Sequence, residues 1–332
     1  MNLDEFIQKL PKTENHLHIE GAVPWELLQT LDPNKYAHAP ESWAENFRFK
    51  DFNEFDKKLL GMVVPWYTSP ERYHEAAKAV FKNLRDRENV RYVETSFASG
   101  VVEFGGIDGK TIAEAVKTAA PEGLEVRVFL GFHHNAYNDR TKDFIEDCIN
   151  WKHLDGIDLH GDETMPLEPW SEKLWKRFND AGKTTKAHAG EFNGPDFIRQ
   201  VVRKLNVKRI QHGEKCVHDY SLVKEIRDRG ITLDVCPISN LKLRVVHSIA
   251  EFPLHSLVAM NVRCTINTDD PVCFGNRLFD DYKIVAEQGG MSKHDLLKVA
   301  RFGFEAADVD ESKRKSWLAE LGKIESNLHP SE

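Results

Sequence analysis

The stretch Thr-Glu-Asn-His-Leu-His-Ile at Thr13–Ile19 decides the fold, because it is the first of eight similar runs along the chain. Most of these runs are apolar and β-branched through their length, as expected for strands that are buried in a parallel sheet. They predict eight strands, at Thr13–Ile19, Arg91–Ala98, Glu125–Phe132, Gly156–His160, Thr185–Ala189, Lys208–Gln211, Ile231–Val235 and Arg263–Asn267.

Amphipathic segments lie between several of these strands and predict helices, at Pro70–Arg87, Thr141–Trp151, Trp170–Ala181, Pro195–Leu205 and Asp219–Arg229. Eight strands that are each followed by a crossover favour an α/β fold of the (β/α)8 TIM barrel type. A doubly wound open sheet is the alternative. We expect one domain over residues 1–332, with a mostly helical insertion after the first strand at Pro24–Asn89. Lys293–Ala306 and Glu311–Glu325 are expected to be extra helices that close the C-terminal end.

Composition excludes several classes of partner. The chain has 332 residues, 41% of them hydrophobic, and its 45 basic and 53 acidic residues give a net charge of −8. This balance favours neither nucleic acid nor an anionic membrane surface as a partner. No apolar run is long enough to cross a membrane, and the acidic start does not resemble a signal peptide. Five scattered cysteines without a Cys-x-x-Cys predict free thiols and a cytoplasmic protein. The sequence specifies no oligomeric state.

Polar side chains gather where the predicted strands end. Seven of the 15 histidines follow strands in this way, namely His16, His18, His133, His134, His160, His188 and His212. Carboxyl groups join them at Glu191, three residues after His188, and at Asp269 and Asp270 after the last strand. In a barrel the carboxyl ends of the strands converge on one face, where such enzymes carry their chemistry.

The His-x-His pair at His16 and His18 places both imidazoles on one side of the first strand, because side chains alternate along a strand. Two imidazoles, a third from another strand and a carboxylate form a divalent metal site, with zinc as the first choice. Histidines that are packed in the core, and a turn at Asp-Asp-Pro, are the alternative interpretation.

Two further side chains suit chemistry beside such a metal. A carboxyl group at Glu191, near an apolar base, would have a raised pKa and could act as an acid. His212 could orient or deprotonate a water molecule on the metal. The alternatives are a solvated loop glutamate or helix cap for Glu191, and a histidine that is packed behind the barrel rim for His212.

Six separated motifs resemble the adenosine and adenine deaminase family of metal-dependent amidohydrolases, and they occur in the order typical of that family. They are His-Leu-His-Ile-Glu-Gly (16–21), Asp-Leu-His-Gly-Asp-Glu (158–163), His-Ala-Gly-Glu (188–191), Arg-Ile-Gln-His-Gly (209–213), Cys-Pro-Ile-Ser-Asn (236–240) and Asn-Thr-Asp-Asp-Pro (267–271). The resemblance spans nearly the whole chain and implies a zinc-bearing (β/α)8 barrel.

The resemblance also implies a role for each residue. The zinc ligands it implies are His16, His18, His188 and Asp269. Glu191 would protonate the purine N1, and His212 would act as the base. Asp270 would bind N7, and the Gly161 N–H would face N3, so that the expected substrate contacts are His18, Glu20, Gly161 and Asp270. Iron, manganese or cobalt could occupy the same ligands.

The expected reaction is hydrolytic deamination of a 6-aminopurine, with adenosine or 2′-deoxyadenosine first. Gly161-Asp162-Glu163 resembles adenosine deaminases, whereas Glu20 and the run 236–243 resemble adenine deaminases, so adenine is the alternative substrate. His160 and Gln211 depart from the family pattern and keep open a modified aminopurine nucleoside or another aminated ring, such as a pterin or a futalosine-like nucleoside. A non-catalytic purine-binding relative is disfavoured, because all four ligands and Glu191 are present.

Two groups outside the shared motifs have two interpretations each. His133 and His134 either contact the variable part of the substrate or form a structural pair. The insertion carries eight large side chains, Trp43, Phe47, Phe49, Phe52, Phe55, Met62, Trp66 and Tyr67. We expect most of them to pack the insertion onto the barrel, and one or two to line the pocket.

Overall fold

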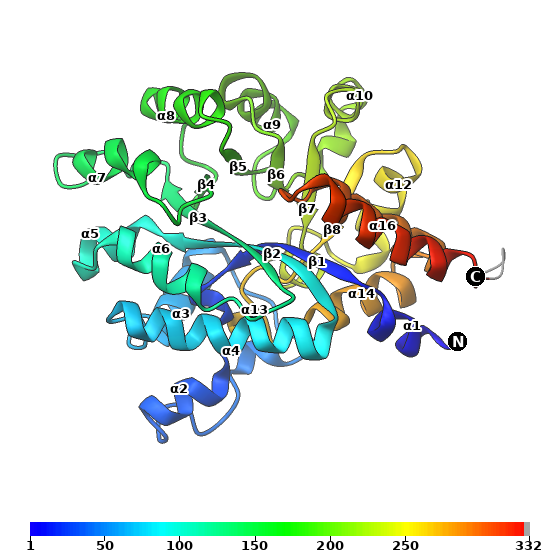
Figure 1. Cartoon of the computed structure of the whole chain (residues 1–332), viewed down its shortest axis with the longest axis horizontal. Coiled ribbons are helices and arrows are strands. Elements are labelled where there is room, and N and C mark those ends of the chain that lie inside the picture. The colour runs from blue at the N-terminus through cyan, green and yellow to red at the C-terminus, as the bar shows by residue number, and fades with distance from the viewer. Residues whose placement is uncertain (329–332) are drawn as a thin grey trace.

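The computed structural model describes residues 1–328 and places eight parallel strands in one sheet, in the order of the chain (Figure 1). The strands are β1 Lys12–His18, β2 Val90–Ala98, β3 Glu125–His133, β4 Gly156–His160, β5 Thr184–Ala189, β6 Arg209–His212, β7 Thr232–Val235 and β8 Arg263–Ile266. Consecutive strands pair from β1 to β8, and a bridge between Leu17 and Asp269 joins the last strand region to the first. The predicted (β/α)8 barrel is therefore confirmed, and each strand lies within one residue of its predicted bounds.

Helices connect the strands and cover the outside of the barrel (Figure 1). The α-helices are α1 Leu3–Lys9, α2 Trp25–Leu31, α3 Phe52–Val63, α4 Pro70–Glu88, α5 Ser99–Gly105, α6 Gly109–Thr118, α7 Lys142–Asp147, α8 Pro169–Asp180, α9 Pro195–Gln200, α10 Tyr220–Asp228, α11 Pro237–Lys242, α12 Leu254–Ala259, α13 Pro271–Phe274, α14 Leu278–Glu287, α15 Lys293–Ala306 and α16 Glu311–Glu325. Shorter helical turns are η1 Glu20–Ala22, η2 Glu41–Trp43, η3 Cys148–Asn150, η4 Val201–Leu205, η5 Glu214–His218 and η6 Ile249–Glu251.

The predicted helices are confirmed, with two changes of detail. The segment 141–151 forms α7 and the turn η3, and the segment 195–205 forms α9 and the π-helical turn η4. The insertion after β1 holds α2, α3 and α4, and α15 and α16 follow β8 as expected. The sequence interpretation missed the helices α1, α5, α11, α12, α13 and α14.

Local signals explain the longest helix, α4, which closes the insertion. The Ser69 side chain accepts a hydrogen bond from the Arg72 N–H, and Pro70 occupies the first turn, where its missing N–H costs nothing. Asn89 ends the helix in a left-handed conformation, with φ of 55°. The buried face of α4 packs against the barrel through residues that recur every three to four positions. These residues are Tyr73, Ala76, Ala77, Val80, Phe81 and Leu84.

A layer of charged side chains lies inside the barrel, below the strand ends. Arg209 donates two hydrogen bonds to Asp234, at 2.6 and 3.1 Å, and a third to Glu94 at 2.9 Å. The second oxygen of Glu94 forms an ion pair with Lys186 at 2.5 Å. All four side chains are buried. Although burial alone would raise the pKa of Glu94, Arg209 and Lys186 hold that pKa below its usual value.

Two expectations about the chain's environment can be compared with the structure. All five cysteines are buried and unpaired, as predicted. Among residues 1–328, no helix has the length and apolar character that crossing a lipid bilayer requires.

Candidate active site

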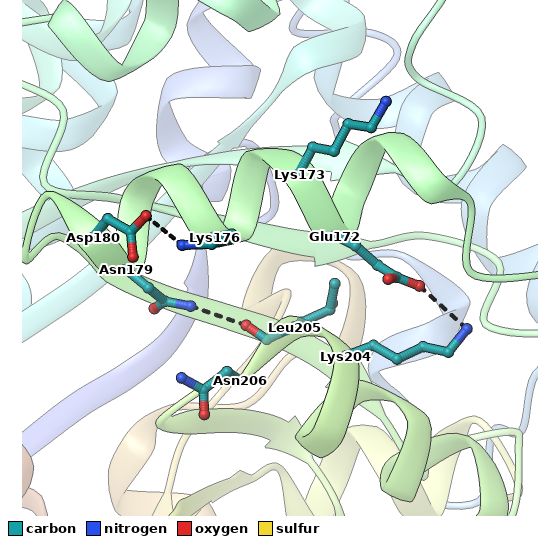
Figure 2. A pocket seen from close by; sticks show the side chains of 8 residues that line it. All are labelled: Glu172, Lys173, Lys176, Asn179, Asp180, Lys204, Leu205 and Asn206. Atoms are coloured by element: carbon teal, nitrogen blue, oxygen red, sulfur yellow. Dashed lines mark hydrogen bonds and ion pairs between the residues drawn. The ribbon is translucent and has the colours of Figure 1, made fainter.

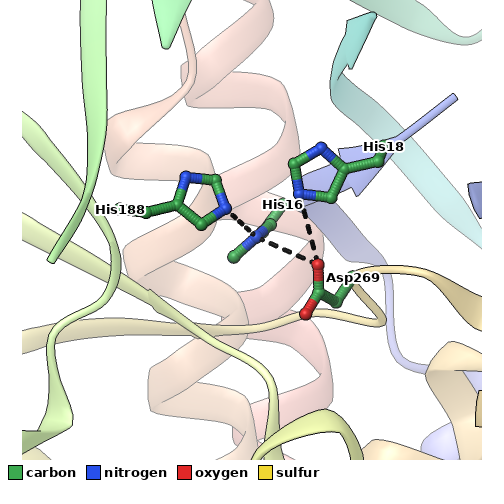
Figure 3. A group of neighbouring side chains, drawn as sticks. All are labelled: His16, His18, His188 and Asp269. Atoms are coloured by element: carbon green, nitrogen blue, oxygen red, sulfur yellow. Dashed lines mark hydrogen bonds and ion pairs between the residues drawn. The ribbon is translucent and has the colours of Figure 1, made fainter. Parts of the chain in front are cut away.

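Four metal-type donor atoms converge at the carboxyl ends of β1, β5 and β8 (Figure 3). They belong to His16, His18, His188 and Asp269, and all lie within 4.8 Å of one another. His16 Nε2 is 3.1 Å from His188 Nε2 and 3.4 Å from Asp269 Oδ1, and His18 Nε2 is 3.3 Å from the same oxygen. Ligands at about 2.0–2.1 Å in a tetrahedron around zinc are about 3.3 Å apart, so these residues fit a divalent metal ion.

Neighbouring groups orient each donor of this cluster. The Nδ1 atoms of His16, His18 and His188 lie 3.0, 2.9 and 3.1 Å from Asp234 O, Ser96 Oγ and Leu159 O, respectively. Because a carbonyl can only accept, Nδ1 of His16 and of His188 carries the proton, and Nε2 presents its lone pair to the cluster. The second carboxylate oxygen of Asp269 accepts a hydrogen bond from the Ser239 hydroxyl at 2.7 Å.

The backbone at Asp269 closes the barrel. Its N–H donates to His16 O at 3.0 Å, and its carbonyl accepts from His18 N at 3.2 Å. Asp269 and His212 both adopt left-handed conformations, with φ of 68° and 65°. Such conformations are uncommon outside glycine and cluster at functional sites, where the surrounding structure enforces them.

Glu191 and His212 lie beside the cluster, with Glu191 Oε2 3.5 Å from His212 Nε2. Both side chains are buried, and Glu191 Oε1 has no hydrogen-bond partner among the described residues. Burial, reinforced by the Asp269 carboxylate, raises the pKa of Glu191 well above its usual value. Burial and the neighbouring His16 lower the pKa of His212 well below its usual value. Both shifts favour the uncharged forms, a protonated carboxyl group at Glu191 and a neutral imidazole at His212.

Glu163 holds the loop that carries Glu191. Its buried carboxylate accepts hydrogen bonds from the backbone N–H groups of Gly190, Phe192 and Asn193. These three hydrogen bonds hold the backbone on both sides of Glu191 in place. The sequence interpretation quoted Glu163 within a motif but assigned it no role.

The other predicted substrate contacts line the same cavity as the cluster. Asp270 is buried, and its Oδ1 has no hydrogen-bond partner among the described residues. A Cβ at Gly21 would lie 1.7 Å from that oxygen, so glycine is required beside it. Glu20 Oε1 accepts hydrogen bonds from the Tyr73 hydroxyl at 2.7 Å and from Ala98 N at 3.1 Å. Gly161 has φ of 89°, a conformation that favours glycine.

The cavity has a volume of about 470 Å³, within the range of small-molecule sites. Every predicted site residue except His16 lines it, and His16 lies buried beneath. Three of the eight large insertion side chains line the wall, namely Phe52, Phe55 and Tyr67. The other five do not line it, so most of the eight stay out of the cavity wall as expected, but one more than the expected one or two lines it.

The four polar residues that the sequence left without a definite role differ in whether they line the cavity. His133 and His160 are register neighbours at the ends of β3 and β4, and both line the cavity. His134 does not line it, because its ring stacks on Phe197 at 5.8 Å and its Nδ1 lies 3.2 Å from Pro166 O. Gln211 is buried and does not line the cavity either.

Several groups of the site were not identified from the sequence. Tyr73 and Ser96 occur in an insertion helix and in mid-strand, with no signal that links them to Glu20 or to His18. Ser239 and Asn240 stand inside the quoted Cys-Pro-Ile-Ser-Asn motif, which could have identified them as neighbours of the site. Asn240 Oδ1 lies 3.3 Å from His212 Nδ1.

A second hollow, of about 450 Å³, lies on the outer surface between α8 and η4 (Figure 2). Its charged side chains pair with one another, Lys176 with Asp180 at 2.6 Å and Lys204 with Glu172 at 3.2 Å. This hollow resembles an ordinary charged surface, in contrast to the unpartnered groups of the barrel cavity.

Comparison with known proteins agrees with this geometry. The adenosine deaminase family model matches residues 11–324. An adenine deaminase from Hahella chejuensis is 29% identical over 337 residues, covering 98% of this chain and 100% of that relative.

Two solved structures share the fold. The adenine deaminase from Arthrobacter aurescens superposes with a TM-score of 0.84 at 23% identity, covering 96% of this chain and 99% of that one. A Burkholderia ambifaria amidohydrolase with bound zinc superposes with a TM-score of 0.82 at 21% identity, covering 98% and 93%. The family model spans the barrel from β1 to α16, and the chain therefore belongs to the adenosine deaminase family of hydrolytic deaminases.

Proposed function

We propose that this chain is a zinc-dependent deaminase that converts a 6-aminopurine nucleoside to the 6-oxo product and ammonia. Adenosine or 2′-deoxyadenosine, giving inosine or 2′-deoxyinosine, is the first candidate substrate. The observation that carries the proposal is the position of Glu191, whose buried carboxyl group lies beside a four-donor metal cluster in one cavity.

The proposed zinc ligands are His16, His18, His188 and Asp269. Their donor spacing fits tetrahedral zinc, and their outer hydrogen bonds set the protonation that ligation needs. When bound, zinc lowers the pKa of water to about 7 and so supplies a nucleophile at neutral pH.

The chain's own groups move the protons. We assign Glu191 to donate a proton to the purine N1 as oxygen adds to C6, which removes the aromatic resistance to that addition. A carboxyl group whose pKa is raised by burial carries this proton at neutral pH. His212, kept neutral by burial, accepts the proton of the attacking water. The C6–N bond then breaks as the amino group takes the proton held by His212 and leaves as ammonia, and the proton of the C6 hydroxyl returns to Glu191 to give the 6-oxo product.

Two groups orient the purine. Burial raises the pKa of Asp270 well above its usual value, so its carboxyl group holds a proton that it can donate to N7. Its unpartnered Oδ1 is consistent with a substrate partner. The Gly161 N–H is assigned to N3, and His18 and Glu20 complete the proposed contacts.

The size of the cavity favours a nucleoside over a free base. A volume of about 470 Å³ exceeds the space that a purine ring alone needs. Adenine is the second candidate, and two observations favour it. The Hahella relative is an adenine deaminase, and one oxygen of Glu20 is already bound by Tyr73 and Ala98, which reduces its capacity to bind a ribose.

The test is ammonia release by the zinc-loaded protein with adenosine, 2′-deoxyadenosine and adenine, measured side by side. Adenosine much faster than adenine supports the nucleoside assignment. Adenine much faster would mean that Glu20 closes the ribose site. No release from any of the three, with zinc bound, would overturn the proposed function. We also propose a cytoplasmic location, which the five buried free thiols support.

A further inference from the structure

Glu214 is a buried carboxyl group whose position the cavity does not explain. It begins the turn η5, two residues after His212, and it does not line the cavity. Its Oε2 has no hydrogen-bond partner among residues 1–328, and the adjacent Lys215 donates to Phe192 O at 3.0 Å instead. Burying a carboxyl group without a full set of partners costs free energy, so this position requires a local reason.

A buried amide connects Glu214 to His212. Asn240, on the helix α11, donates from Nδ2 to Glu214 Oε1 at 2.5 Å. The amide oxygen of Asn240 lies 3.3 Å from His212 Nδ1. The donor end of the amide therefore faces Glu214, and its acceptor end faces His212. We call these three side chains, Glu214, Asn240 and His212, the His212 relay.

Two consecutive left-handed residues bring the His212 relay together. The strand β6 ends at His212 with φ of 65°, and Gly213 continues with φ of 84° before η5 begins at Glu214. A Cβ at Gly213 would lie 2.7 Å from Leu233 Cδ2, so glycine is required between the two side chains. This tight turn keeps Glu214 close enough to share Asn240 with His212.

The relay determines which ring nitrogen of His212 carries the proton. An amide oxygen can only accept, so its contact with Nδ1 places the proton on Nδ1. Nε2 then presents its lone pair beside Glu191 and Asp269, on the cavity side. If the Asn240 amide turned over, its N–H groups would face Nδ1, and the proton would move to Nε2. His212 could then no longer accept a proton from a water molecule in the cavity.

We propose that Glu214 is a positioning residue for the reaction, which holds the Asn240 amide so that His212 keeps its proton on Nδ1 and a free lone pair on Nε2. This inference rests on the proposed function, in which His212 accepts the proton of the attacking water. Glu214 neither lines the cavity nor belongs to the four proposed metal donors, so it acts on the reaction through Asn240.

The first test measures turnover by the zinc-loaded protein. Glu214→Met keeps the length of the side chain but removes the acceptor, so kcat should fall about 10- to 100-fold while KM and zinc content stay unchanged. Glu214→Gln keeps a carbonyl oxygen for Asn240 and should restore most of kcat. Glu88→Met is the matched control, because Glu88 is a buried carboxylate on α4 that accepts from Phe279 N at 2.9 Å and does not line the cavity.

The second test gives a readout that a merely structural role would not change. Long-range ¹H–¹⁵N NMR spectra of the zinc-loaded protein distinguish a protonated ring nitrogen from a free one. The signals of His212 are identified by their loss in His212→Gln. We expect the proton on Nδ1 in the unaltered protein and in Glu214→Gln, and a proton on Nε2, wholly or in part, in Glu214→Met.

Each other outcome overturns a particular claim. A proton on Nε2 of His212 in the unaltered protein, or equal losses of kcat in Glu214→Met and Glu88→Met, overturns the positioning role. An unchanged kcat in Glu214→Met does the same and leaves the proposed function intact. A proton that moves to Nε2 in Glu214→Met, in a protein that deaminates no purine, would confirm that Glu214 positions His212 and would overturn the proposed function.

Discussion

The barrel interior contains two polar layers that differ in how their charges are satisfied. In the lower layer, Arg209 and Lys186 pair with Asp234 and Glu94, and each of the four charges faces an opposite one. In the upper layer, Glu191 Oε1 and Asp270 Oδ1 are buried without any hydrogen-bond partner among residues 1–328.

This difference in pairing distinguishes a layer that stabilises the fold from a layer that binds a ligand. Buried polar groups normally find partners, so an unpartnered group that lines a cavity implies that a ligand supplies the partner. A fully paired layer has no such need and serves to hold the strands that carry the site. We therefore expect substitutions in the upper layer to reduce mainly activity, and substitutions in the lower layer to reduce mainly stability.

The largest expected effect is in the upper layer. Asp269→Ala removes one of four proposed metal donors and should leave the purified protein with little zinc and no turnover. Elemental analysis after zinc loading and desalting measures this loss. Retention of one zinc per chain would remove Asp269 from the ligand set.

Glu191→Gln separates the reaction from metal binding. The amide keeps the shape of the side chain but cannot donate the carboxyl proton, so kcat should fall by about 10²- to 10⁴-fold. Zinc content and the urea midpoint should match those of the unaltered protein. A near-normal rate would exclude Glu191 as the acid.

Arg209→Met tests the lower layer. It leaves Glu94 and Asp234 short of their counter-charge in a buried site, which should reduce the free energy of unfolding by about 3–5 kcal/mol. Arg203→Met is the control, since Arg203 pairs with Glu225 at 2.9 Å on the surface and should contribute less than about 1 kcal/mol. Equal losses in the two variants would contradict the assignment of the lower layer to stability.

The smallest expected effect concerns Glu214, which is buried but does not line the cavity. Burial raises its pKa to about 8, so the folded protein keeps a proton that the unfolded chain loses above its ordinary pKa. Stability should therefore fall as pH rises from about 5 to about 9. Glu214→Gln keeps an acceptor for Asn240 and should reduce this fall by up to about 3 kcal/mol between pH 6 and pH 9. Urea unfolding of both proteins at pH 6 and pH 9 measures the difference, and parallel pH dependence would show that Glu214 is charged in the fold.

The sequence was sufficient to predict the barrel and the strand-end residues. Apolar runs such as 125–132 and 263–267 indicate buried strands from local sequence alone. Parallel strands in a barrel bring their polar carboxyl ends together, independently of the loop conformations. The sequence was not sufficient for the lower layer. Glu94 and Arg209 are 115 positions apart in the chain, and neither carries a local sign of its partner.

The same reason explains the missed contacts of the site. Tyr73 on α4 meets Glu20 only because the fold brings α4 beside the segment that follows β1. Contacts between distant elements depend on packing angles that residue patterns do not specify.

The bridge between Leu17 and Asp269 links closure of the barrel to the proposed metal site. This junction of the last strand region with the first is formed by the same backbone that carries His16, His18 and Asp269. If the barrel opened at this junction, His16, His18 and Asp269 would move apart. A metal ion bound to these three residues would therefore stabilise the closed barrel. Amide hydrogen exchange at His18 and Asp269 should slow when metal is added, while the amides between β4 and β5 keep their rates.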